Sequence, residues 1–535
     1  MALLSTLCLL LFIVSSSFSI ETSSELTIVP STTTVAQSTA LNVTWYNSDP
    51  ASSDDWIAFW QIGSNPSTDS NFVQFSWQYT YGGQSSAPST VNKSPSTTGT
   101  IALVAPSQTG VYQMYYCLNN GYTCPTSVKI EVVPAILPKV NCPKDGKVMS
   151  SIEHIILIVS ENHSFDSIYG SYCEAPTNSN PQCTEGSKCC EAAPAVLSGR
   201  TPYDLTDAEN VAFDPDQSQK GEVCKQNGGK MDNYVGLACP FSSDDRNFAI
   251  ADETSGHIYR QMARNYAMAD RCFQSAAGAS SENDMYYITG QFLFIDNLAV
   301  PQNSDLIGAR CYNNNFLTFY NPTILDLLSE CGVSWVNYAE GYGINPSSTQ
   351  CYPNYYDASD FAASYYPRLT NNPEDHWKDM QEFFADVSKG NLPSYGYIKG
   401  LGINSEHPGN TLSGGENITQ LVIDSVQNSE KYRNNTLIIL IPDESGGFYD
   451  HITPPNVSAI DGQPYGPRIP MVLVGDAVYK NYVSHIQMEP TSIVKFIEWN
   501  WFGGETGQLK TRDQVVANLG SLIDPEKAGI QVPIW

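Results

Sequence analysis

Two apolar runs of the sequence each end in a pair of oxygen-bearing side chains. The pairs are Glu161 with Asn162 after residues 152–159, and Asp443 with Glu444 after residues 437–441. In an open α/β sheet the binding crevice lies outside the carboxyl ends of the strands, so both pairs are expected in one crevice. Carboxylates and an amide oxygen are hard ligands that suit a divalent cation. We therefore predict that these four residues bind a metal ion; the alternative is that they cap helices or solvate loops.

The apolar runs also indicate the elements that position these side chains. Both are nearly continuous stretches of Ile, Leu and Val, which is typical of strands buried on both faces of a parallel sheet. A third run covers residues 470–474, and helix-like segments cover residues 255–269 and 491–501, the latter opening with a capping Thr or Ser. Strands that alternate with helices predict an α/β fold with a doubly wound, mostly parallel sheet.

A different pattern occupies residues 20–135, before this region. Short alternating or apolar runs recur between turn-rich stretches, which predicts a small antiparallel, immunoglobulin-like β-sandwich. Cys117 and Cys124 flank an Asn-Gly turn signal, so we expect a disulfide across that hairpin. Residues 136–149 contain two prolines and form the predicted linker to a second domain, residues 150–535. The runs lie at residues 40–45, 56–60, 100–104, 111–117 and 127–133.

The composition restricts the classes of protein to which the chain can belong. Its 535 residues are 41% hydrophobic and 15% charged, which excludes a wholly disordered polymer. The chain has 27 Lys and Arg against 55 Asp and Glu, a formal net charge of −28 and a pI near 4.4. This charge excludes nucleic-acid binding through a basic face and opposes contact with anionic membranes.

Several features predict an oxidising compartment outside the cytosol. Residues 1–19 contain an apolar run followed by small polar residues, which predicts a cleaved secretory signal; a buried strand or a short membrane anchor is the alternative. Removing that signal with Cys8 leaves 13 of the 14 Cys, an odd number that implies a free thiol or an intermolecular bridge. Their spacing favours disulfides over a zinc site. Sequons predict a glycosylated surface, at Asn42, Asn92, Asn417, Asn434 and Asn456.

Several longer motifs resemble those of a known family. The first two are E-N-H-S-F-D at residues 161–166 and D-E-S-G-G-F-Y-D-H-I-T-P-P at residues 443–455. On these motifs, residues 150–500 resemble the bacterial and plant phosphoesterase family, which contains non-specific phospholipases C and a class of acid phosphatases. Further motifs agree in order along the chain: N-G-G-K-M-D at 227–232, E-H-P-G-N at 406–410, G-P-R-I-P-M-V at 466–472 and T-S-I-V-K-F-I-E-W at 491–499.

The resemblance implies an alkaline-phosphatase-like α/β/α sandwich with a metal ion beside a hydroxyl nucleophile, and makes residues 150–535 the catalytic domain. The family's metal ligands correspond to the two pairs at the strand ends. Its Ser or Thr nucleophile corresponds to Ser280, with Ser281 as a second candidate. His407 in E-H-P is the candidate for protonating the leaving oxygen. Asn162 also begins a glycosylation sequon. Because a glycan there would block the site, a metal ligand role for Asn162 implies that this sequon is not glycosylated.

Three positions depart from the family's pattern. Gln217 in D-P-D-Q, Tyr365 in Y-Y-P-R and Ser445 in D-E-S each stand where family members carry a His. These positions would supply phosphate contacts or proton transfer. Their replacement therefore bears on the catalytic rate and on the choice of substrate.

The sequence thus predicts a secreted or lysosomal, metal-dependent phosphoesterase that forms a phosphoseryl intermediate and is most like an acid phosphatase. The net charge and the lack of an obvious apolar loop for lipid favour that activity over the alternative, a phospholipase C. A second alternative is a catalytically degenerate protein whose β-sandwich binds glycans or other proteins. The expected partners are a phosphate-ester or phospholipid substrate and a divalent metal ion, with no nucleic acid and no stable membrane insertion.

Overall fold

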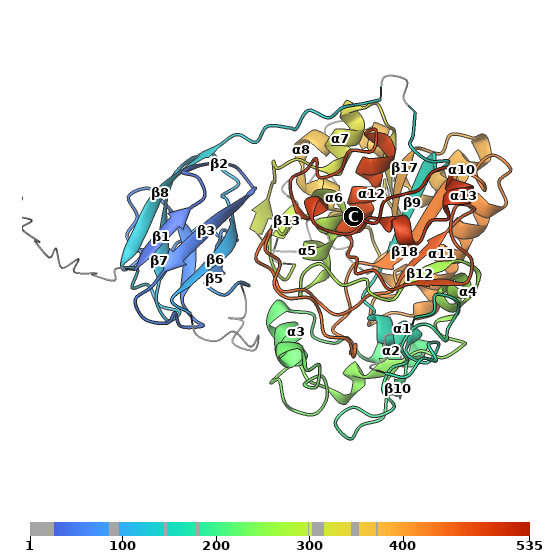
Figure 1. The fold of residues 1–535 in the computed structure, drawn as a ribbon, viewed down its shortest axis with the longest axis horizontal. Helices are drawn as coiled ribbons and strands as arrows, with labels where there is room; N and C mark the ends of the chain where they lie inside the picture. The colour runs from blue at the N-terminus through green and yellow to red at the C-terminus, as the bar shows by residue number, and fades with distance from the viewer. Residues whose placement is uncertain are drawn as a thin grey trace, which may run out of the picture.

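A computed structural model describes residues 26–84, 96–143, 147–177, 182–297, 299–301, 315–343, 353–370 and 373–535. The predicted signal at residues 1–19 and the sequon at Asn92 lie outside the described residues. Figure 1 shows the strands of residues 27–133 gathered beside a larger body that contains the other helices and strands.

The strands of residues 27–133 form a three-stranded sheet and a five-stranded sheet. Trp45 of one sheet shares a buried apolar cluster with Ile57 and Phe59 of the other, so the two sheets pack face to face. The sheet orders are β1-β3-β6 and β2-β8-β7-β4-β5. The strands are β1 (Thr27–Pro30), β2 (Thr34–Ala36), β3 (Ala40–Tyr46), β4 (Trp56–Gln61), β5 (Trp77–Tyr79), β6 (Thr98–Val104), β7 (Gly110–Cys117) and β8 (Thr126–Val133).

The larger body is built on an eight-stranded mixed sheet. Most neighbouring strands are parallel, but the strand at 471–474 is antiparallel to both of its neighbours. The mixed α/β class is thereby confirmed, and the doubly wound arrangement stays a prediction. In sheet order the strands are β16 (Trp377–Asp379), β15 (Trp335–Ala339), β17 (Tyr395–Lys399), β9 (His154–Ser160), β18 (Thr436–Pro442), β19 (Met471–Val474), β12 (Ala267–Ala269) and β20 (Tyr482–Ser484).

Strand β9 shows why the central runs are continuously apolar. Ile155 and Leu157 belong to one buried cluster, whereas Ile156 and Ile158 belong to another. Successive side chains of a strand point to opposite faces, so both faces of the sheet at β9 are covered by apolar residues. Each position of the run is therefore selected for burial.

The helices surround this sheet, and short strand pairs connect some of the loops (Figure 1). The helix predicted at residues 491–501 is present, but Pro490 precedes it and no side chain caps it. The segment predicted as helix at 255–269 divides into the helix α4 (His257–Asn265) and the strand β12. The short pairs are β10 (Tyr203–Asp204) with β11 (Ala249–Ile250), and β13 (Ala299–Pro301) with β14 (Asn315–Leu317).

The helices are α1 (Phe165–Tyr169), α2 (Asp207–Ala212), α3 (Gln219–Gln226), α4 (His257–Asn265), α5 (Ser280–Asp284), α6 (Tyr286–Thr289), α7 (Ile324–Glu330), α8 (Pro367–Thr370), α9 (Pro373–His376), α10 (Met380–Lys389), α11 (Leu412–Gln427), α12 (Thr491–Trp501) and α13 (Pro525–Ala528). None of these helices is long and apolar enough to cross a membrane, a finding that covers the described residues alone.

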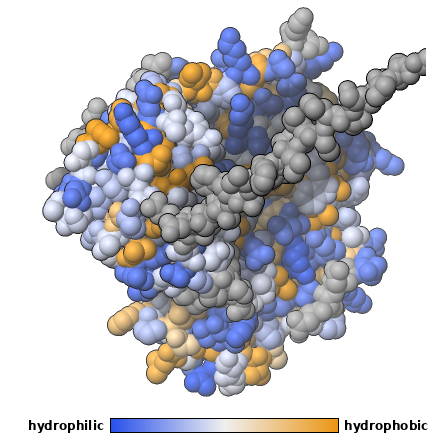
Figure 2. Space-filling view, turned by 60° about the vertical axis from the view of Figure 1, so that its left-hand side comes forward, coloured by the Kyte–Doolittle hydropathy of each residue, from blue (hydrophilic) through white to orange (hydrophobic). Residues whose placement is uncertain are grey.

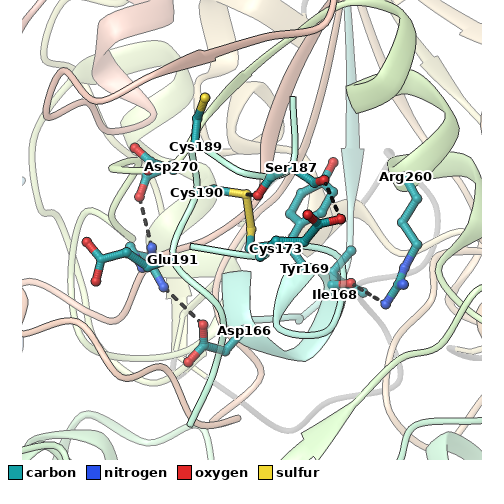
Figure 3. The surroundings of a disulfide bond; sticks show 12 residues. Asp166, Ile168, Tyr169, Cys173, Ser187, Cys189, Cys190, Glu191, Arg260 and Asp270 are labelled. Carbon is teal, nitrogen blue, oxygen red and sulfur yellow. Dashed lines mark hydrogen bonds and ion pairs between the residues drawn. A yellow bond between two sulfur atoms is a disulfide. The ribbon is translucent and has the colours of Figure 1, made fainter. Parts of the chain in front are cut away.

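Disulfides connect several loops of the chain. The expected bridge between Cys117 and Cys124 is confirmed, and Cys272 is a buried free thiol. Figure 3 shows Cys173 bonded to Cys190, with Asp166 and Glu191 nearby. Such bridges are typical of oxidising compartments, as the sequence predicted. The other bridges within the described residues are Cys142–Cys331, Cys183–Cys189 and Cys224–Cys239.

Candidate active site

Strands β9 and β18 bring the two predicted ligand pairs to one edge of the main sheet. The strands are parallel neighbours, and their register sets Ser160 opposite Pro442. Glu161 and Asp443 are the next residues, so the two loops begin side by side. The backbone N–H of Asn162 donates to Asp443 Oδ1 at 3.4 Å. All four predicted ligands are at most 2% exposed.

Ser280 is the first residue of α5 and lies against these side chains. Its Oγ is 3.2 Å from Glu161 Oε2 and 3.2 Å from Asn162 Oδ1. Ser281 differs, because its backbone N–H donates to Asn297 Oδ1 at 2.7 Å and its hydroxyl contacts Tyr365. The structure therefore brings Ser280, and not the hydroxyl of Ser281, into contact with the predicted ligands.

Further charged residues of this site were missed in the sequence. Lys399 ends β17, which is the other neighbour of β9, and Asp284 ends α5. The Nζ of Lys399 lies 2.7 Å from Glu161 Oε1, 3.0 Å from Asp284 Oδ2 and 3.2 Å from Asp443 Oδ2. The strand-end rule that identified the acidic pairs would also have identified Lys399, had residues 395–399 been recognised as a strand.

Lys399 neutralises only part of the negative charge in this cluster. Burial by itself would raise the pKa of Glu161, but Lys399, together with His407 and Ser280, outweighs burial and lowers that pKa. Burial and neighbouring carboxylates raise the pKa values of Asp443 and Glu444 well above their ordinary range. The site is therefore rich in carboxylate oxygens that need a further cation or a proton.

The donor set fits a divalent metal ion. Glu444 Oε1 is buried and makes no hydrogen bond to any described residue, which is costly for a charged oxygen without a partner. Ser280 has one hydroxyl proton but lies at hydrogen-bonding distance from two acceptor oxygens. Three carboxylates and one amide oxygen form the kind of hard-oxygen set that divalent cations such as Mg²⁺, Mn²⁺ and Ca²⁺ prefer.

The position of Asn162 fits a ligand and not a glycosylation site. Its side chain is fully buried, and its backbone has a φ of 62° that few residues other than Gly adopt. Its Oδ1 faces Ser280, whereas Nδ2 has no hydrogen-bond partner among the described residues. A glycan cannot be attached to a side chain enclosed in this way. The described sequons that are exposed are Asn42, Asn417, Asn434 and Asn456.

A second group of potential ligands, Asp166, Asp450 and His451, connects the two signature motifs. One ligand atom of each lies within 4.8 Å of the others. The buried Arg468 guanidinium lies among them, with Nε 2.8 Å from Asp450 Oδ1 and one terminal nitrogen 3.0 Å from Asp166 Oδ1. Because a cation already pairs with both carboxylates, we interpret this group as an ion-pair cluster that joins the two motifs.

His407 lies within electrostatic range of Glu161, whereas Ser280 contacts Glu161 directly. The Nδ1 of His407 is 2.5 Å from Pro408 O, and His407 also lies within electrostatic range of Asp214. Burial nevertheless raises the pKa of Asp214. Gln217, which replaces a family His, donates from Nε2 to Asp214 Oδ1 at 3.0 Å. The segment that lost this His therefore still lies within electrostatic range of His407.

The other two replaced positions are occupied by packed or hydrogen-bonded side chains. Tyr365 is buried against the ring of Phe294. Ser445 donates from Oγ to Glu222 Oε1 at 2.9 Å, and burial raises the pKa of Glu222 to about 8. Glu222 was missed, because nothing in the sequence of α3 indicates that this helix packs against the loop of the second signature motif.

Comparison with known proteins agrees with the motifs. A family model described as "Phosphoesterase family" matches residues 152–502. Non-specific phospholipase C6 of Arabidopsis thaliana is 24% identical over 370 residues, which cover 64% of this chain and 65% of the relative. Phospholipase C B of Mycobacterium tuberculosis is 25% identical over 432 residues, which cover 70% of this chain and 78% of the relative. The match therefore spans slightly less than two thirds of the plant relative.

Among solved structures, the phosphonate monoester hydrolase SpPMH from Silicibacter pomeroyi aligns with 58% of this chain and 76% of its own. The sequence identity is 13% and the TM-score is 0.24.

Proposed function

Because this chain belongs to the phosphoesterase family, we propose that it hydrolyses phosphoric esters with Ser280 as the nucleophile. The observation that best supports this role is the contact of Ser280 Oγ with Glu161 and Asn162, 3.2 Å from each. In the first step, Oγ bonds to phosphorus while the bond from phosphorus to the ester oxygen breaks. The leaving oxygen takes up a proton, and water then cleaves the phosphoseryl group to release phosphate or a phosphomonoester.

Glu161, Asn162, Asp443 and Glu444 are the residues that would hold a divalent ion. When bound, such an ion lowers the pKa of a neighbouring hydroxyl and stabilises negative charge on the phosphoryl group. Lys399 keeps Glu161 and Asp443 paired and in place, at 2.7 Å and 3.2 Å. His407, which lies within electrostatic range of Glu161, is proposed to give the proton to the leaving oxygen.

Two substrate classes fit this chemistry. The named relatives are phospholipases C, which favours a phospholipid head group. The acidic composition, with a pI near 4.4, favours acid-phosphatase-like action on phosphomonoesters. The disulfides support action outside the cytosol after secretion. We also propose that residues 20–135 form a separate β-sandwich domain, and that residues 150–535 are a catalytic domain of the alkaline-phosphatase-like type.

The substitution Ser280→Ala tests the nucleophile. We expect turnover of an aryl phosphate and of phosphatidylcholine to fall by about 10³-fold or more, because the variant lacks the hydroxyl that contacts Glu161 and Asn162. Ser281→Ala is the matched control and should retain most of the activity. Circular dichroism and melting curves of both variants should match those of the unchanged protein.

Two results would contradict the proposal at different points. Full activity of Ser280→Ala would reject the nucleophile and turn attention to Ser281. If the unchanged protein, dialysed against chelator and then reloaded with Mg²⁺, Mn²⁺, Ca²⁺ or Zn²⁺, cleaved neither substrate between pH 4 and pH 9, the catalytically degenerate alternative would hold. In that case the replacements at Gln217, Tyr365 and Ser445 would explain the loss.

A further inference from the structure

A small loop near the candidate site exposes an almost continuous apolar surface. Residues 237–241 read Leu-Ala-Cys-Pro-Phe. Leu237 is 94% exposed and Phe241 is fully exposed, with Ala238 and Pro240 also exposed between them. We name these four side chains the apolar tip. The sequence showed no obvious apolar loop for lipid, because a run of five residues is too short to stand out, whereas the structure exposes these side chains together.

The apolar tip is held rigidly from beneath. Cys239 is bonded to Cys224 at the end of α3, and its carbonyl accepts hydrogen bonds from the backbone N–H groups of Ser242 and Ser243 at 3.0 Å each. Phe241 has a φ of 72°, a conformation that is unfavourable for an aromatic residue. A loop fixed in this way loses little conformational entropy on docking, yet it leaves its large apolar side chains in water.

The same helix connects the apolar tip to the candidate site. Cys224 holds the tip, while Glu222, two residues earlier in α3, accepts a hydrogen bond from Ser445 beside Glu444. Residues two apart on a helix point to nearly opposite sides, so α3, which is about 10 Å across, lies between the tip and the loop of Ser445. Lys225, the next residue after Cys224, donates to Gly447 O at 2.9 Å. The tip and the loop that carries Asp443 and Glu444 are thus both fastened to α3, and a surface that bound the tip would lie one helix width from that loop.

We propose that the apolar tip inserts into a zwitterionic phospholipid surface, from which the site takes its substrate. The tip is convex and has only two large side chains, which is too little for a stable protein interface but suits insertion at the head-group level. Arg200 and Arg246 beside it are paired with Asp245 and Asp244 at 2.7 Å and 2.9 Å. These pairs leave no excess of positive charge, and the net charge of −28 opposes anionic lipid.

The chain that follows α3 lies at the lower end of the molecule in Figure 1, and Figure 2 shows hydrophobic side chains exposed at that end. The choice of lipid as the occupant depends on the proposed phosphoester hydrolysis, whereas the exposed tip does not. Binding and turnover must therefore be measured separately.

The test compares the full chain with the double variant Leu237→Ser/Phe241→Ser in flotation with phosphatidylcholine vesicles. We expect the unchanged protein to bind, and the variant to bind at least about 100-fold more weakly, because each large apolar side chain contributes about tenfold or more to partitioning. Leu421→Ser/Val515→Ser removes two exposed apolar side chains elsewhere and should bind as the unchanged protein does. Turnover of a water-soluble aryl phosphodiester should be equal in all three, whereas turnover of vesicle lipid should fall only in the tip variant.

Several outcomes would overturn the proposal. They are failure of the unchanged protein to bind phosphatidylcholine, equal binding by the tip variant, a requirement for anionic lipid, or loss of self-association as the only effect of the variant. If no ester were cleaved but vesicle binding still depended on the tip, the proposed hydrolysis would fail and the docking surface would stand.

Discussion

At the scale of single residues, the sequence indicated those candidate-site residues that come directly after a buried strand. Glu161 and Asp443 could be found because each comes directly after a continuous apolar run, and the register of β9 with β18 then sets them side by side. Ser280 was proposed only through the family resemblance, since a serine in a Ser-rich loop carries no pattern of its own. Lys399 was missed because the run Y-G-Y-I-K at 395–399 is short and contains a Gly, which weakens a strand prediction.

The pairing of Lys399 leads to a prediction about stability and metal binding. Lys399→Met leaves the carboxylates of Glu161, Asp284 and Asp443 without their shared ammonium group. Removing one partner from a buried ion pair costs about 3–5 kcal/mol, so the variant should melt at a lower temperature in the presence of chelator. Added Mg²⁺ or Mn²⁺ should restore part of that loss, because a cation can then replace the ammonium group.

Lys378→Met is the matched control for this measurement. Its partner Asp386 lies at 2.6 Å, but the Lys378 side chain is 26% exposed, so the variant should lose less than about 1 kcal/mol. Calorimetric scans of both variants, with chelator and with each metal ion, provide the comparison. Equal melting of Lys399→Met and the unchanged protein in chelator would show that Lys399 does not neutralise the cluster.

At the scale of elements, the sequence predicted the long buried strands well. It did not predict the short strands or the antiparallel direction of β19. The central runs of β9 and β18 are apolar at every position because both faces are covered. The run at β19 looks the same in the sequence although the strand is antiparallel, since burial does not depend on the direction of a strand. Strands β1, β2 and β5 were missed because their three or four residues are too few to show a period.

The ion-pair cluster joining the α1 segment to the second signature motif predicts a pH dependence of stability. Burial alone would lower the pKa of His451, but Asp166 and Glu191 outweigh burial and raise that pKa to about 9. Its unfolded pKa is about 6.5. The protonated form is therefore stabilised by folding, and this contribution is complete below about pH 6.5 and is lost as the pH rises through 9.

The variant His451→Asn isolates this contribution. Between pH 6.5 and pH 9.5, the free energy of unfolding of the unchanged protein should fall by about 2–3 kcal/mol more than that of the variant. Urea unfolding at both pH values measures the difference, and other titrating groups affect both proteins alike. Parallel losses in the two proteins would mean that His451 is neutral in the folded state.

At the scale of the whole molecule, the contact between the sandwich and the larger body could not be predicted from the sequence. Nothing in the composition of residues 20–135 marks the residues that face the body. In the structure Gln78 donates from Nε2 to Asp461 O at 2.9 Å, and Gln291 donates from Nε2 to Ser38 O at 2.9 Å. Phe75 of the sandwich segment belongs to the main apolar cluster of the body and contacts the ring of Phe294.

This contact predicts that the sandwich and the body unfold together. Phe75 is buried in the core of the other unit, so its loss removes apolar contacts on both sides of the boundary. Phe75→Ala should cost about 3–5 kcal/mol, and should split a single calorimetric transition into two as the coupling between the units weakens. Phe72→Ala is the control, because the Phe72 ring contacts Trp56, Trp60 and Trp77 within the sandwich segment. It should lower the melting temperature without separating the transitions. Two transitions in the unchanged protein, or a single one in Phe75→Ala at an unaltered temperature, would show that the units are thermodynamically independent and that the buried glutamine contacts do not couple them.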